Sequence, residues 1–84
     1  MVLGPTAASF LGLPVARLEA VVGEPSLVRR EGRNEFRRYD LGDCRAYAIV
    51  AGSGGNIITL TTGPSVAGMA PKPLEQCTAL PAGT

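Results

Sequence analysis

GLPVARLEAVVGEPSLVRREGRNEFRRYDLGDC, residues 12–44, is the stretch that decides the fold. Apolar residues recur in its first part at the spacing of one helix face: Val15, Leu18, Val21 and Val22. This pattern predicts a short amphipathic helix that ends at Gly23, because glycine adopts the left-handed conformation cheaply, and Pro25 prevents the helix from resuming. A helix of about nine residues is not stable alone, so it must lie on an apolar surface.

Strand-like segments separated by short turns follow this helix. They occupy residues 27–31, 35–41, 44–50 and 57–62, with glycine-containing connections between them. Short connections between consecutive strands predict an antiparallel meander. An earlier helical turn is expected at Ala7–Leu11, where Thr6 can cap the start.

Together these elements predict the α+β class, with two short N-terminal helices packed on one face of a three- or four-stranded antiparallel meander. The 84 residues suit a single small domain. Its core is expected at about residues 6–62. The Pro-rich tail, residues 63–84, has little to hold it to the rest of the chain.

Cys44 and Cys77 are the only cysteines in the chain. An even number of cysteines, one of them in the Pro-rich tail, favours a disulfide and therefore an oxidising compartment such as a periplasm or the cell exterior. The alternative is a pair of free buried thiols in a cytosolic protein. A bridge would compensate for a core that is marginal in so short a chain.

Several kinds of chemistry are absent from the sequence. The chain has no histidine, the most common general base and metal ligand, and two cysteines alone cannot close a zinc site. The glycine-rich run at 52–55 lacks the residues of a phosphate-binding loop. The net charge is +1, which attracts neither nucleic acid nor anionic membrane. We therefore expect no enzyme activity, cofactor, metal, small-molecule substrate or nucleic-acid partner.

Arginine and aromatic side chains gather in the predicted strands, and both types are frequent anchors of protein interfaces. The candidate partner contacts are Phe36, Arg37, Tyr39, Arg45 and Tyr47. For each aromatic residue, the alternative is a place in the core.

The order of these motifs carries a resemblance. A helix, the Gly-Glu-Pro stop at 23–25, the segment LVRREG, a strand ending in Tyr39 and then Cys44 resemble the SmpA/OmlA (BamE-like) domain of small outer-membrane lipoproteins, alphaproteobacterial type. In this resemblance Gly23 and Pro25 form a structural helix stop, and a downstream cysteine is typical. The chain departs from the pattern at Arg37, where the family has tryptophan.

The resemblance implies helices on one face of an antiparallel sheet and a periplasmic location, associated with the outer membrane. It also implies envelope proteins as partners, with β-barrel assembly components among them, and contact with the membrane through an anchor outside this chain. An export signal is expected upstream of Met1. The leading hypothesis is a non-enzymatic envelope module that acts by protein contacts. The alternative is an inhibitor or immunity-type domain that binds an enzyme, by analogy of fold.

Overall fold

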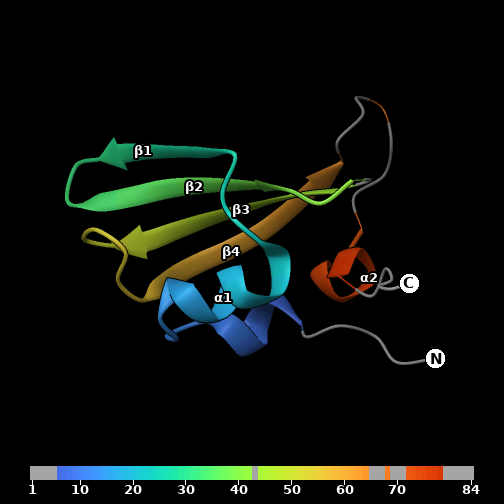
Figure 1. The fold of residues 1–84 in the computed structure, drawn as a ribbon, viewed down its shortest axis with the longest axis horizontal. Helices are drawn as coiled ribbons and strands as arrows, with labels where there is room; N and C mark the ends of the chain where they lie inside the picture. The colour runs from blue at the N-terminus through green and yellow to red at the C-terminus, as the bar shows by residue number, and fades with distance from the viewer. Residues whose placement is uncertain (1–5, 43, 65–67, 69–71, 79–84) are drawn as a thin grey trace.

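The fold is built on a four-stranded antiparallel sheet in which each strand pairs with the next along the chain (Figure 1). The computed structural model describes residues 6–42, 44–64, 68 and 72–78. The elements in chain order are the 3-10 helix η1 (Ala7–Phe10), α1 (Val15–Val22), β1 (Leu27–Glu31), β2 (Asn34–Asp40), β3 (Cys44–Ala51), β4 (Ile57–Pro64) and α2 (Leu74–Thr78).

The expected fold class is wrong in its helices. Two N-terminal helices were expected on the sheet, but η1 is a four-residue 3-10 turn, and α1 is the one N-terminal α-helix in the described part of the chain. The side chain of Thr6 accepts a hydrogen bond from the Ser9 N–H, as in a capped turn. Gly12 and Pro14 follow too soon for a longer helix to form. Strand is therefore the dominant structure.

A tight turn sets the register of the first hairpin. Glu31 lies opposite Asn34, so only two residues join β1 to β2. Gly32 in this turn has a φ of 65°, a conformation that two-residue hairpins require and that other residues adopt only with strain. The antiparallel pairing continues through β3 and β4, with one bulge at Ile49/Val50.

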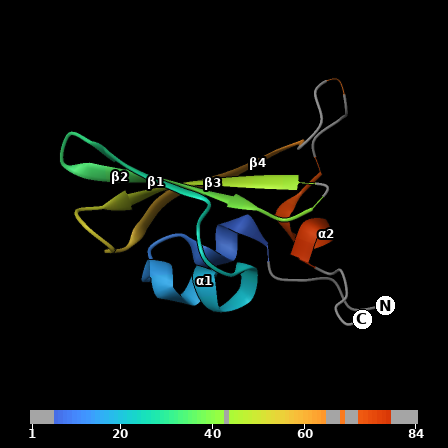
Figure 2. The same ribbon diagram turned by 45° about the horizontal axis from the view of Figure 1, so that its top comes forward.

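The helices cover one face of the sheet and leave the other open (Figure 2). Alternate residues of the strands point into the core between the sheet and the helices, as the period of a strand requires. The buried residues of this core are Phe10, Val15 and Leu18 from the N-terminal elements, Tyr39, Ala46, Ala48, Val50, Ile57 and Leu60 from the strands, and Leu74 from α2.

The face that α1 turns to the core differs from the sequence prediction at two positions, Val21 and Glu19. Val15 and Leu18 are buried, but Val21 is 47% exposed, and Glu19 lies on the buried side in its place. Glu19 is four residues after Val15, a spacing that puts two side chains on the same face of a helix. The helix ends at Val22, before Gly23, whose φ is 90°.

Backbone hydrogen bonds tie the segment before α1 to the start of β4. The N–H of Gly12 donates to the carbonyl of Ile57 at 2.9 Å, and the N–H of Ile57 donates to the carbonyl of Leu13 at 2.9 Å. Part of the β4 edge is therefore covered. The opposite edge is different, because all five residues of β1 are exposed.

Candidate functional site

The open face of the sheet collects aromatic and arginine side chains, most of them partly exposed. We define it as the strand residues that alternate with those of the core. The register places on it Leu27, Arg29 and Glu31 of β1, Asn34, Phe36, Arg38 and Asp40 of β2, Arg45, Tyr47, Ile49 and Ala51 of β3, and Thr59, Thr61 and Gly63 of β4.

Phe36 and Tyr47 form a stacked pair on this face. Their ring centroids are 6.0 Å apart and the ring planes differ by 27°. The guanidinium carbon of Arg29 lies 5.4 Å from the centroid of the Phe36 ring, which is the geometry of a cation–π contact. Gly63 leaves room for the Tyr47 ring, since a Cβ at this position would lie 3.2 Å from it. We call Arg29, Phe36 and Tyr47 the aromatic row.

Two ion pairs lie beside the aromatic row. Arg29 Nε is 2.8 Å from Glu31, and Arg45 Nε is 3.1 Å from Asp40. The second contact has no hydrogen-bond geometry, although the Arg45 Nε atom is buried. Ion pairs this exposed are worth about 0–1 kcal/mol, so a partner can replace them at little cost.

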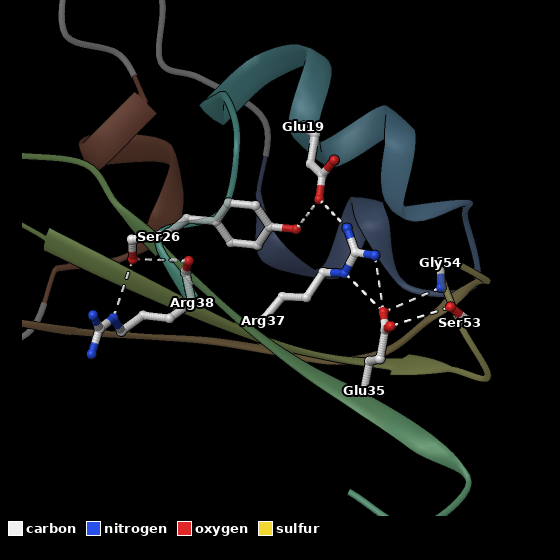
Figure 3. A network of polar contacts seen from close by, with 8 residues as sticks. Glu19, Ser26, Glu35, Arg37, Arg38, Ser53 and Gly54 are labelled. Atoms are coloured by element: carbon white, nitrogen blue, oxygen red, sulfur yellow. Dashed lines mark hydrogen bonds and ion pairs between the residues drawn. The ribbon is translucent and has the colours of Figure 1, made fainter. Parts of the chain in front are cut away.

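Arg37 and Tyr39, two of the expected partner contacts, lie on the covered face instead. Figure 3 shows the Arg37 side chain between Glu19 and Glu35. Arg37 Nη1 donates to Glu19 Oε2 at 2.6 Å, and the Tyr39 hydroxyl donates to the same oxygen at 2.6 Å. Arg37 Nε and Nη2 both donate to Glu35 Oε1, at 3.0 and 2.9 Å. The Arg37 side chain is only 16% exposed and Tyr39 is fully buried, so neither can anchor a partner.

The loop between β3 and β4 completes this polar network. The Gly54 N–H donates to Glu35 Oε1 at 3.2 Å, and the Ser53 hydroxyl donates to Glu35 Oε2 at 3.3 Å. Figure 3 shows the Glu35 carboxylate between Arg37 and the two loop residues. The network therefore fastens α1 and the loop to β2, which is a structural role.

The electrostatics of the network favour the charged form of Glu35 and the neutral form of Tyr39. The hydrogen bond from Arg37 lowers the pKa of Glu35, against the opposing effect of burial. Burial would lower the pKa of Arg37, but its bonds to Glu35 and Glu19 outweigh this and raise it. Burial raises the pKa of Tyr39, and donation to Glu19 raises it further.

Cys44 and Cys77 form a disulfide, with their Cα atoms 6.0 Å apart. The bridge joins the start of β3 to α2, whose Leu74 is buried in the core. The Thr62 hydroxyl also donates to the carbonyl of Lys72 at 2.7 Å. The segment 72–78 is thus fixed to the covered face beside α1 (Figure 1).

Of the five expected contact residues, the structure brings Phe36, Arg45 and Tyr47 together on the open face. Sequence reasoning missed Arg29, which packs over Phe36, and Glu19, which accepts a hydrogen bond from Arg37. A two-residue turn at Gly32 and Arg33 would have been the signal for the first, because it pairs Arg29 with Phe36. The helical spacing from Val15 was the signal for the second.

Three further findings concern the residues that the structure describes, which are 6–42, 44–64, 68 and 72–78. These residues include no helix long and apolar enough to cross a membrane. They also include no group of three side chains suited to hold a metal ion, and no pocket. In comparisons with known proteins, no family model, curated protein or solved structure matched the chain.

Proposed function

We propose that this domain is a non-enzymatic protein-binding module and that the open face of its sheet is the contact surface. The observation that carries this proposal is the aromatic row, a stacked Phe36–Tyr47 pair with Arg29 over it, on the face that the helices leave uncovered. Aromatic and arginine side chains contribute most of the binding energy in many interfaces. Side chains held by their neighbours also lose less rotamer freedom on binding.

The charges of the open face indicate the chemistry of the partner surface. Arg29, Arg38 and Arg45 surround the rings, whereas Glu31 and Asp40 supply two negative charges, which leaves a net charge of +1. A complementary surface is apolar where it meets the rings and carries carboxylates around them. This describes the surface of a folded protein better than that of a small ligand.

We also propose that the domain works in the cell envelope, near the outer membrane, with envelope proteins such as β-barrel assembly components as partners. The disulfide supports an oxidising compartment, where such bridges persist. The motifs around Gly23, Pro25 and Tyr39 support the resemblance to small outer-membrane lipoproteins. A fusion of the protein, as encoded in its own genome, to alkaline phosphatase tests the location, because this reporter is active only where disulfides form. An inactive fusion would contradict the envelope location.

Site-specific photo-crosslinking in the native cell tests the contact surface. A photoreactive residue at Thr61, which lies opposite Tyr47 on the open face, should give a discrete crosslinked protein. The matched control is the same residue at Ala20, which is exposed on α1. We expect no crosslink from Ala20, and loss of the Thr61 crosslink when Tyr47→Ser is added. Equal products from both positions, or a product indifferent to Tyr47→Ser, would contradict the proposal.

A further inference from the structure

The two edges of the sheet are not equivalent. Residues 12–14 cover part of the β4 edge through backbone hydrogen bonds. No described segment lies along β1, and each of its residues is exposed. β1 carries charged side chains, which help to protect edge strands, but it contains no proline and no bulge against β2 between Leu27 and Glu31.

The hairpin turn decides which backbone groups of β1 are free. With a two-residue turn, Glu31 and Asn34 form a hydrogen-bonded pair, and such pairs alternate along an antiparallel ladder. Arg29 and Leu27 therefore also bond to β2. The N–H and C=O groups of Val28 and Arg30 point away from the sheet, with the spacing that an added strand needs.

The side chains at this edge are basic toward the hairpin turn and apolar at the other end of β1. Residues 29–33 include three arginines and one glutamate, a net charge of +2. Arg30 and Arg33 form no ion pair with any described residue. At the other end of β1, Leu27 and Val28 are 36% and 46% exposed. An acidic strand with some apolar residues would complement this edge.

We propose that β1 accepts an extended, acidic segment of a protein partner as an additional strand of the sheet. The backbone groups of Val28 and Arg30 would supply the ladder hydrogen bonds, and Arg29, Arg30 and Arg33 the charge selectivity. A second copy of this chain fits less well. Full antiparallel alignment of two β1 strands places Arg29 opposite Arg29, and like charges in opposed positions are destabilising.

This binding mode goes beyond the contact proposed for the open face. It uses the backbone at the edge of the sheet, shares only Arg29 with the aromatic row, and does not require Phe36 or Tyr47. Either proposal can therefore fail without the other.

Peptide titration followed by NMR tests the edge proposal. The probe is a short synthetic peptide of alternating valine and glutamate, added to the ¹⁵N-labelled domain, with a valine–lysine peptide as the matched control. We expect the amide signals of Val28 and Arg30 to shift and their exchange with solvent to slow. The glutamate peptide should bind about tenfold more tightly than the lysine peptide. Equal affinity for both peptides, or shifts confined to the open face, would overturn the proposal.

A proline at Val28 separates strand addition from other kinds of binding. Val28→Pro removes an outward N–H and leaves the β1–β2 ladder intact, whereas Val28→Thr keeps the N–H. Val28→Pro should lose peptide binding and Val28→Thr should retain it. Arg30→Gln, which leaves every backbone group in place, should weaken binding and reduce its dependence on salt. Full binding by a folded Val28→Pro variant would overturn the proposal. So would a stable dimer of the domain without peptide, if Val28→Pro abolished that dimer, because β1 would then pair with a second copy of the chain.

Discussion

The Tyr39 hydroxyl donates a hydrogen bond of 2.6 Å to the Glu19 carboxylate, and this contact links the middle of β2 to α1. Arg37 donates to the same oxygen at the same distance. A helix of eight residues is held to the sheet partly by these polar contacts, because Val15 and Leu18 are its only fully buried side chains. Stability should therefore depend strongly on the network.

Removing the Tyr39 hydroxyl should destabilise the protein. Tyr39→Phe keeps the buried ring but deletes a hydrogen bond to a charged group, which costs about 1–3 kcal/mol. Urea unfolding followed by circular dichroism measures this change in the free energy of unfolding. The control is Tyr47→Phe, on the open face, for which we expect a change within about 0.5 kcal/mol. Equal effects of the two substitutions would contradict the structural role of Tyr39.

Reversing the charge of Arg37 should prevent folding. Arg37→Glu places a third carboxylate beside Glu19 and Glu35 in a poorly solvated position. Loss of a buried ion-pair partner costs roughly 3–5 kcal/mol, comparable to the stability of a small domain. Arg38→Glu is the matched control, since Arg38 lies on the open face and, among the described residues, its side chain bonds only to Ser26 Oγ, at 3.2 Å. Amide NMR spectra should show a folded Arg38→Glu and an unfolded Arg37→Glu; two folded variants would refute this prediction.

The acid limb of the stability curve should depend on Glu35. Its pKa is lowered from 4.5 in the folded state, so the folded state favours the carboxylate. This contribution to stability is fully present above pH 4.5 and is lost as the pH falls through the lower, folded-state pKa. Urea midpoints measured from pH 7 downward should decline in that range for the parent protein. The decline should be smaller in Glu35→Gln, and an identical decline in both would contradict the prediction.

The alkaline limb should depend on Tyr39. Its pKa is raised from 10.0, so the folded state favours the neutral phenol. The resulting stabilisation is present below pH 10 and is lost as the pH rises through the higher, folded-state pKa. Urea midpoints above pH 10 should fall more steeply in the parent than in Tyr39→Phe. Parallel curves would show that the phenol is not what titrates.

The disulfide should account for a large share of the stability. In the chain-entropy model, a loop closed over a sequence separation of 33 is worth roughly 3–4 kcal/mol. Replacing both cysteines by serine should lower the free energy of unfolding by this amount and weaken the protection against hydrogen exchange of the Gln76 amide, which donates to the Pro73 carbonyl at 3.0 Å. A reducing agent should reproduce the loss in the parent and leave the double variant unchanged. If the reducing agent also destabilised the double variant, the loss of stability in the parent would have a cause other than the disulfide.

Sequence reasoning located the strands well, because alternation and glycine turns are local signals. In β3, the small residues Ala46 and Ala48 alternate with Tyr47 and Ile49, and that pattern is the burial pattern in the structure. The helices were harder to predict. The sequence did not distinguish a 3-10 turn from an α-helix at residues 7–10, because four residues make about one turn of either helix and show no repeat.

Charged residues caused the main error at the site. Arg37 and Glu35 alternate with Phe36 and Arg38, so the pattern of β2 allowed either set to face the core. Phe36, Arg37 and Tyr39 were all expected to contact a partner, although neighbouring residues of a strand face opposite sides of the sheet. The structure buries Glu35 because Arg37, Ser53 and Gly54 satisfy it, and those partners come from other elements. Contacts of this kind depend on the three-dimensional arrangement and leave no local signal.

The most direct test of the proposed contact surface uses the partner identified by the Thr61 crosslink. It measures how tightly this partner binds the Tyr47→Ser variant. Tyr47 stacks on Phe36 at one end of the aromatic row, and an anchor of this kind is worth about 2 kcal/mol or more. We predict at least a tenfold loss of affinity, with the amide spectrum of the variant still that of the folded domain. An unchanged affinity in the folded variant would contradict the assignment of the open face as the binding surface.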